Sequence, residues 1–146
     1  GAAEGEIRKA ILQEDLVEAV IGLPTNLFYG TGIPAAVLIL NRAKRPERRR
    51  KVIFVEASRG FKQSTTQNYL REEDVELASK TFHAFKDVTK YAQVVDLFDI
   101  ERNDWNLNIS RYVETADAAE KVDVASAIAK LRELGSSVAF VMVDLL

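Results

Sequence analysis

The amino-acid sequence predicts an α/β domain in which a β-sheet is followed by a mostly helical region. Three short β-rich runs lie before residue 56, and helical periodicity recurs after residue 70. The composition, 47% hydrophobic and 29% charged over 146 residues, is that of an ordinary globular domain. A chain of this length can bury one hydrophobic core without metals or cross-links. We expect a sheet domain over residues 1–70 and a helical region over residues 71–146.

One helix and three strands are expected in the first half. Apolar side chains at helical spacing predict an amphipathic helix over residues 4–13. Residues 16–23 are a β-rich run that ends at a proline, which indicates a strand. Residues 33–40 are apolar at every position, as in a strand that is covered on both faces. Residues 52–55 form the third strand, and their short basic connection to residues 33–40 predicts an antiparallel hairpin.

The second half is expected to be more helical. Residues 71–85 carry an apolar stripe and open with acidic residues that suit a helix N-terminus. Residues 91–97 are a short β-like run, and residues 103–108 are rich in Asn and Asp, which is typical of an ordered loop. From residue 121 the apolar residues recur at steps of three and four, which predicts a helical seam that either docks on a partner or folds back on its own domain. The seam consists of Val122, Ala125, Ile128, Leu131, Leu134, Val138, Val141 and Leu145.

Several kinds of chemistry are excluded by composition. The chain has no cysteine and a single histidine, His83, so it can build neither a thiolate zinc site nor a multi-histidine metal cluster. His83 lies off the apolar stripe of its helix, and we expect it to be exposed and without a catalytic role. We expect no metal and no membrane-spanning segment, and we expect a cytoplasmic protein. Because neither end carries a helix cap, we also expect an excised piece of a longer protein.

A concentrated basic segment spans residues 42–51. It holds seven positive residues and one negative residue, although the whole chain has a net charge of −2. Such a segment can attract phosphate groups. It can equally be a solvated connection that keeps a sheet edge soluble. The candidates for phosphate contacts are Arg45, Arg48, Arg49 and Arg50.

The loop between the first two strands places Phe28 and Tyr29 beside Gly30 and Gly32. A loop at the rim of a sheet can project side chains while its glycines allow the backbone to approach a ligand closely. The aromatic residues of this loop have two possible interpretations. The aromatic residues either hold a planar base or, in the case of Phe28, plug the end of the core.

Three blocks of sequence, in a fixed order, resemble the modification subunit of type I restriction-modification systems, an adenine-specific DNA methyltransferase. The first is Leu-Pro-Thr-Asn-Leu-Phe-Tyr-Gly-Thr-Gly-Ile-Pro-Ala-Ala-Val-Leu-Ile-Leu-Asn-Arg at residues 23–42. The second is Gln-Asn-Tyr-Leu at residues 67–70, and the third is Asn-Asp-Trp-Asn-Leu-Asn-Ile with Arg-Tyr-Val at residues 103–113. The resemblance implies that the strands close a methyltransferase-type sheet. It also implies a full-length enzyme that uses S-adenosylmethionine and acts with DNA, a specificity subunit and a restriction subunit.

The family's catalytic motifs are not found in this chain. The Asn-Pro-Pro-aromatic motif needs adjacent prolines, whereas Pro24, Pro34 and Pro46 stand apart. The pattern Phe-x-Gly-x-Gly at residues 28–32 imitates the cofactor motif, but it leads into a β segment rather than a helix. We therefore expect a fragment that has no catalytic residue, binds no cofactor and is inactive alone.

The resemblance assigns one role to the aromatic loop. Residues 23–34 correspond to the family's late motif, in which an aromatic side chain stacks on the flipped adenine, so Phe28 is the expected stacking residue and Tyr29 the second choice. The helical seam is expected to dock on the specificity subunit. The alternative is a stand-alone, non-catalytic module that binds helical partners through the seam and nucleic acid through the basic segment.

Overall fold

The computed structural model describes residues 1–115 and the backbone of residues 139–144. The helices are α1 (Ala2–Gln13), α2 (Glu72–Ala84) and α3 (Leu97–Arg102), with short 3₁₀ helices η1 (Pro46–Arg48) and η2 (Ile109–Arg111). The strands are β1 (Val17–Gly22), β2 (Ala35–Leu40), β3 (Lys51–Glu56), β4 (Ala92–Asp96) and β5 (Ala139–Asp144). The predicted helices at residues 4–13 and 71–85 and the three early strands are thereby confirmed.

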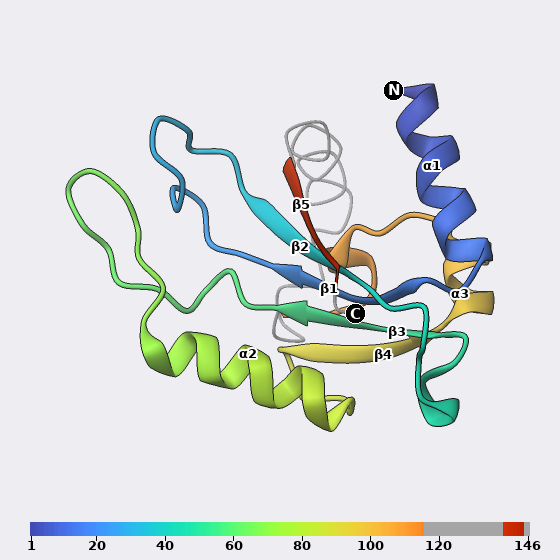
Figure 1. Ribbon diagram of the computed structural model, residues 1–146. Helices are drawn as coiled ribbons and strands as arrows, with labels where there is room; N and C mark the ends of the chain where they lie inside the picture. Colours follow the sequence, from blue (N-terminus) through green and yellow to red (C-terminus); the bar gives the residue numbers. More distant parts are fainter. Residues whose placement is uncertain (116–138, 145–146) are drawn as a thin grey trace, which may run out of the picture.

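The strands form one mixed sheet in the order β4-β3-β1-β2-β5 (Figure 1). β1 runs antiparallel to β2 and parallel to β3. β4 is antiparallel to β3, and β5 is parallel to β2. The α/β class is therefore confirmed.

The expected hairpin between residues 33–40 and 52–55 is wrong, because β1 lies between β2 and β3. The basic connection does not turn back on β2. It crosses the amino-terminal end of β1, where Lys44 Nζ lies 2.7 Å from Asp15 Oδ1 and Arg48 Nη1 lies 3.4 Å from Glu18 Oε1. These ion pairs hold the connection across β1, and β3 then pairs along the far side of that strand.

Helices cover both faces of the sheet, with α2 on one face and α1, α3 and η2 on the other. Alternate residues of β3 point to opposite faces. Val52 and Phe54 belong to the cluster that includes α3 and η2 residues, whereas Ile53 and Val55 belong to the cluster that includes Phe82 of α2. The apolar strands of the sequence are accordingly buried on two sides, as the unbroken apolar run in β2 predicts.

The second half differs from expectation in two places. β4 and β5 lie beyond residue 70 yet join the same sheet, so the expected boundary at that residue does not divide the sheet. Residues 139–144, expected to continue the helical seam, form strand β5, because Ala-Phe-Val-Met-Val-Asp is rich in β-branched and aromatic residues that favour a strand beside β2. Most of the seam lies outside the described residues. In the part that the structure describes, no helix is long and apolar enough to span a membrane.

Candidate functional site

Two loops project from the same edge of the sheet. The aromatic loop, residues 23–34, follows β1, and the supporting loop, residues 57–70, follows β3. Because β1 and β3 are parallel, their carboxyl ends meet at one edge, and the two loops extend from it side by side (Figure 1). The carboxyl ends of parallel strands are where open α/β sheets bind their ligands.

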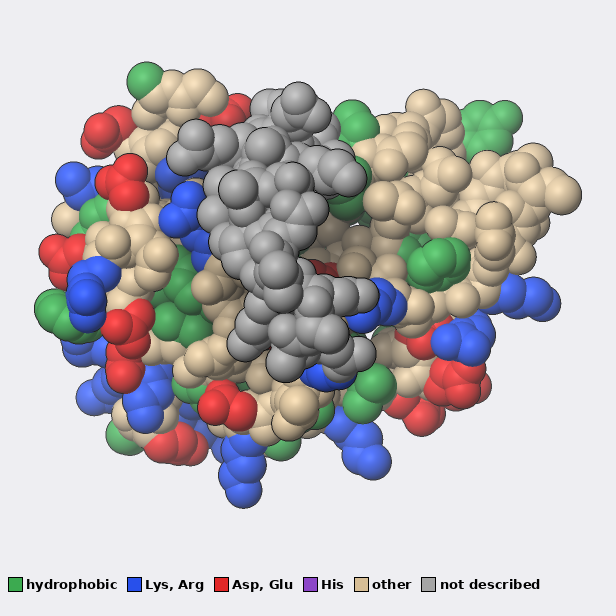
Figure 2. Space-filling model, turned by 180° about the vertical axis from the view of Figure 1, so that it is seen from behind, with side chains coloured by type: hydrophobic (Ala, Val, Ile, Leu, Met, Phe, Trp, Pro, Cys, Tyr) green, Lys and Arg blue, Asp and Glu red, His purple; other side chains and the backbone are tan. Residues whose placement is uncertain are grey.

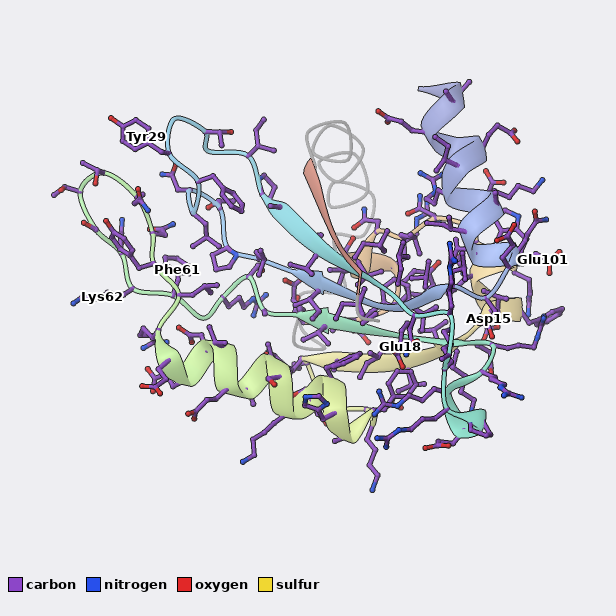
Figure 3. All side chains as sticks on the ribbon, in the orientation of Figure 1. Asp15, Glu18, Tyr29, Phe61, Lys62 and Glu101 are labelled. Carbon is purple, nitrogen blue, oxygen red and sulfur yellow. The ribbon has the colours of Figure 1, made fainter. Side chains whose placement is uncertain are left out.

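The aromatic loop exposes both of its aromatic side chains. Phe28 is 46% exposed and Tyr29 is 92% exposed, and Tyr29 points away from the body of the protein (Figure 3). Gly30 has a φ of 79°, in the left-handed region that glycine adopts readily. It closes a turn in which the Thr31 N–H donates to the Phe28 carbonyl over 3.3 Å. Phe28 belongs to neither buried cluster, so it does not plug the core.

The supporting loop is closed on itself and fastened to the aromatic loop. Lys62 and Tyr69 exchange two backbone hydrogen bonds of 2.7 and 2.9 Å at its neck. Asn68 donates from its backbone N–H to the Asn26 carbonyl and from Nδ2 to the Thr25 carbonyl, each over 2.8 Å. The first two sequence blocks of the resemblance, 43 residues apart at Thr25 and Asn68, are therefore in direct contact. No local sequence signal indicates this contact.

The third block, residues 103–113, packs against the sheet below the loops. The Tyr112 ring stacks on Phe54 with centroids 4.2 Å apart, and its hydroxyl donates to the Asn106 carbonyl over 2.5 Å. Burial raises the pKa of the Tyr112 phenol to about 12. A Cβ on Gly22 would lie 2.8 Å from Ile109 Cδ1, so glycine at the end of β1 lets η2 approach closely. The third block thus has a structural role.

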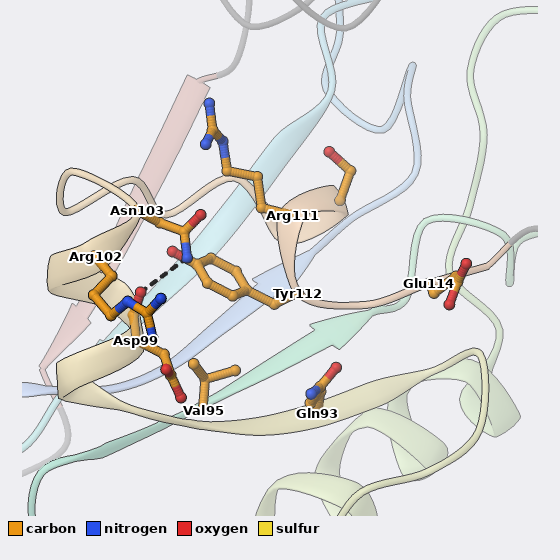
Figure 4. A pocket seen from close by; sticks show the side chains of 9 residues that line it. Gln93, Val95, Asp99, Arg102, Asn103, Arg111, Tyr112 and Glu114 are labelled. Atoms are coloured by element: carbon orange, nitrogen blue, oxygen red, sulfur yellow. Dashed lines mark hydrogen bonds between the residues drawn. The ribbon is translucent and has the colours of Figure 1, made fainter. Parts of the chain in front are cut away.

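Two cavities lie beside this block. One, of about 600 Å³, lies at the base of the aromatic loop between α1 and η2, where Gly22, Leu23 and Pro34 line it. The other, of about 760 Å³, lies over β4 and is shown in Figure 4. Its lining includes Arg102 and Arg111 but also two carboxylates, and Asn103 Nδ2 donates to the Asp99 carbonyl over 2.8 Å within it. The mixture of charges gives the second cavity no clear preference for anions.

The basic segment lies at the opposite edge of the sheet from the aromatic loop, because it joins the carboxyl end of β2 to the start of β3. Two of its cations, Lys44 and Arg48, are buried in the ion pairs with Asp15 and Glu18. Figure 3 shows both carboxylates at this end of the sheet. The exposed phosphate candidates are Arg45, Arg49 and Arg50.

Charged side chains lie over much of the surface. In the view from behind, Lys and Arg side chains also border the lobe formed by the two loops, which is otherwise mostly backbone and uncharged polar side chains with isolated hydrophobic ones (Figure 2). The carboxyl-edge lobe therefore combines exposed aromatic rings and uncharged groups with two exposed cations, Arg59 and Lys62. His83, at the end of α2, is exposed as expected.

S-adenosylmethionine, the cofactor implied by the resemblance, does not fit the residues of the glycine pattern. Gly30 and Gly32 lead directly into β2, so no helix N-terminus follows them to bind the ligand. The expectation that this pattern is not a cofactor motif agrees with the strand that follows it.

A family model and several known proteins match this chain in sequence. The N-6 DNA Methylase family model matches residues 1–121. The chain is 38% identical to the type I restriction enzyme MjaVIII methylase subunit of Methanocaldococcus jannaschii, with 92% of this chain and 24% of that protein covered. It is 35% identical to the HindI methylase subunit of Haemophilus influenzae, with 87% of this chain and 31% of that protein covered.

A solved structure agrees with these sequence matches. The type I restriction-modification methyltransferase subunit from Streptococcus thermophilus superimposes with a TM-score of 0.71 at 38% identity, covering 78% of this chain and 24% of that one. The chain thus spans about a quarter to a third of the length of the relatives it matches. Since the family model covers most of the 146 residues, this chain belongs to the N-6 DNA methylase family.

Proposed function

We propose that this chain is part of an S-adenosylmethionine-dependent adenine methyltransferase, the modification subunit of a type I restriction-modification system, and that it supplies the loop that holds the target base. The observation that carries the proposal is an exposed Phe28 on a closed turn at the carboxyl edge of the sheet. The family membership and the names of the relatives support the parent reaction.

The chemistry of adenine methylation gives such a ring a role. The exocyclic amino group is inaccessible inside a duplex, so an enzyme that modifies it must rotate the nucleotide out of the stack. An aromatic side chain then restores part of the lost stacking, a contribution of about 1–3 kcal/mol per base. Phe28 meets the requirement because its ring is half exposed and its backbone is fixed by the turn. Tyr29, almost fully exposed, is the second candidate.

The other components of the reaction come from outside this chain. The three-quarters of the relatives that the chain does not match would supply the cofactor site and the groups that contact the amino group. DNA, a specificity subunit and a restriction subunit are the proposed partners, and the cytoplasm is the proposed compartment. The isolated chain is proposed to be inactive.

Substitution of the ring tests the proposal in the full-length subunit. We expect Phe28→Ala to lower the single-turnover methylation rate about 10- to 100-fold, since one stacked base is lost. Tyr29→Ala, adjacent and more exposed, is the matched control and is expected to reduce the rate less. Circular dichroism should show both variants folded, because neither ring lies in a buried cluster. An unchanged rate for Phe28→Ala contradicts the assignment.

A further inference from the structure

Asn68 is a buried polar side chain at the carboxyl edge of the sheet. Its exposed fraction is 9%. The other buried polar residues of the described part have roles elsewhere, in the ion pairs of the basic segment and within α2. A buried amide is costly unless it is hydrogen-bonded. The hydrogen-bond partner of Asn68 Nδ2 therefore indicates the role of this side chain.

The bonds of Asn68 and its neighbour run to consecutive carbonyls of the aromatic loop. Asn68 Nδ2 donates to the Thr25 carbonyl and its backbone N–H to the Asn26 carbonyl, each over 2.8 Å. Gln67 Nε2 donates to the Leu27 carbonyl over 3.4 Å. Consecutive carbonyls alternate in direction along an extended strand, and the left-handed φ of 59° at Asn26 breaks that alternation. The bonds fix the backbone up to the residue that precedes Phe28.

The supporting loop is also anchored to α2, through Asp74. Asp74, near the start of α2, accepts hydrogen bonds from Arg71 N, Nε and Nη2 over 3.0, 2.9 and 3.0 Å. Its carboxylate fills the space beside Gly60, where an added Cβ would clash with Asp74 Oδ1. With the backbone bridge between Lys62 and Tyr69, these contacts connect α2 to Asn68 through an ordered segment.

We propose that Asn68 is a positioning residue for the target-base ring, acting through the Thr25 and Asn26 carbonyls to hold Phe28 where a flipped adenine can stack on it. The inference rests on the proposed function of Phe28. A ring fixed in advance loses less conformational freedom when the base arrives, so the stacked state is favoured. The supporting loop contributes no ring of its own to the base in this proposal.

The experiment uses the full-length subunit assembled with its DNA-recognition partner. The variants are Asn68→Ala, Phe28→Ala and the double variant, with Gln63→Ala as the control because Gln63 is exposed in the same loop. Three quantities are measured: the single-turnover methylation rate, the dissociation constant for DNA, and the fluorescence of 2-aminopurine placed at the target adenine, which rises when the base leaves the stack.

We expect Asn68→Ala to lower the methylation rate about tenfold, the equivalent of one lost hydrogen bond. The 2-aminopurine signal should fall in parallel, while the DNA dissociation constant changes less than about threefold. A residue that acts through Phe28 has nothing left to position once that ring is removed, so the double variant should be no slower than Phe28→Ala. Gln63→Ala should match the wild type in all three measurements.

Two results overturn the inference while leaving the proposed function intact: an unchanged rate for Asn68→Ala, or additive losses in the double variant. If Phe28→Ala itself has no effect, the proposed function fails instead. Where Asn68→Ala does not fold, Asn68→Ser retains a hydroxyl donor and replaces it in every comparison. An intermediate loss of rate and fluorescence is then expected, and a wild-type rate contradicts the proposal.

Discussion

Arg48 shows how the surroundings of a single residue decide its role. Its guanidinium carbon lies 5.4 Å from the Phe82 ring centroid and 4.6 Å from that of Phe85. Nη1 lies 3.4 Å from Glu18 Oε1, and Nη2 donates to the His83 carbonyl over 2.6 Å. Cation–π contacts, an ion pair and a hydrogen bond to the last turn of α2 together satisfy a buried charge. Arg48 therefore joins β1 to α2, although it stands among arginines that face water.

This arrangement predicts a large effect of one truncation. Arg48→Ala removes the cationic partner of the buried Glu18 carboxylate, which retains the Asn41 Nδ2 donor at 3.0 Å, so the free energy of unfolding should fall by about 3–5 kcal/mol. Urea denaturation of the full-length subunit, followed by hydrogen exchange of the α2 amides, measures the loss. Arg49→Ala, at an exposed neighbouring position, should change stability by less than about 0.5 kcal/mol.

The double variant Arg48→Met with Glu18→Leu distinguishes the contribution of the ion pair to stability from that of side-chain packing. Removing both charges leaves no uncompensated carboxylate, so most of the lost stability should return. Equal losses for Arg48→Ala and Arg49→Ala would contradict the structural role of Arg48.

At the scale of elements, the sequence predicts which faces are buried better than it predicts which strands are neighbours. The unbroken apolar run in β2 indicated burial on both faces, and the structure confirms it. β1 lies between β2 and β3, and the connection that crosses it forms ion pairs with Asp15 and Glu18, which no strand periodicity encodes. In β5, apolar residues at steps of three and four predict a helix, but the residues form a strand that pairs with β2, as their β-branched and aromatic composition favours.

In the candidate site, too, some residues can be identified from the sequence and others cannot. Phe28 and Tyr29 could be named from a local motif, because the aromatic and glycine residues are adjacent in sequence. The role of Asn68 could not, because its partner Thr25 lies 43 positions away and an asparagine in a polar loop has no distinctive spacing. The burial of Arg48 could not be predicted either, because nothing in the sequence distinguishes it from Arg49 and Arg50. Only its contact with Glu18 in the folded structure does so.

The basic segment gives a prediction at the element scale. If its exposed arginines contact DNA phosphates, replacing Arg45, Arg49 and Arg50 with glutamine removes up to three contacts. The slope of log K against log salt concentration should then flatten by up to about 2.7. The measurement is a salt titration of DNA binding by the full assembly. Lys80→Gln, an exposed cation on α2, is the control. If the slope equals that of the control, the exposed arginines of the basic segment do not contact DNA and face either solvent or a protein partner.

On the scale of the whole molecule, the proposed base contact and the proposed phosphate contacts lie at opposite edges of the sheet. The strands between them have six residues and both features lie in connections beyond the strand ends, so the two features are separated by more than about 20 Å. One strand of B-DNA rises about 3.4 Å per nucleotide, so a duplex that touches both features would run along the direction of the β-strands for more than about six base pairs. Direct base contact and salt-dependent affinity would then be separable by mutation.

The final prediction concerns the proposed division of roles between this chain and the rest of the full-length subunit. The cofactor motif of the family requires a strand that leads into a helix, whereas the glycine pattern here leads from a turn into β2. Isothermal titration calorimetry with S-adenosylmethionine should therefore detect binding to the full-length subunit and none to the 146-residue chain. Removal of Gly30 and Gly32 by alanine substitution should leave the cofactor affinity of the full-length subunit within about twofold, a change of less than 0.5 kcal/mol. Tight binding to the isolated chain would move the cofactor site into these strands and contradict the proposal that the remaining sequence supplies it.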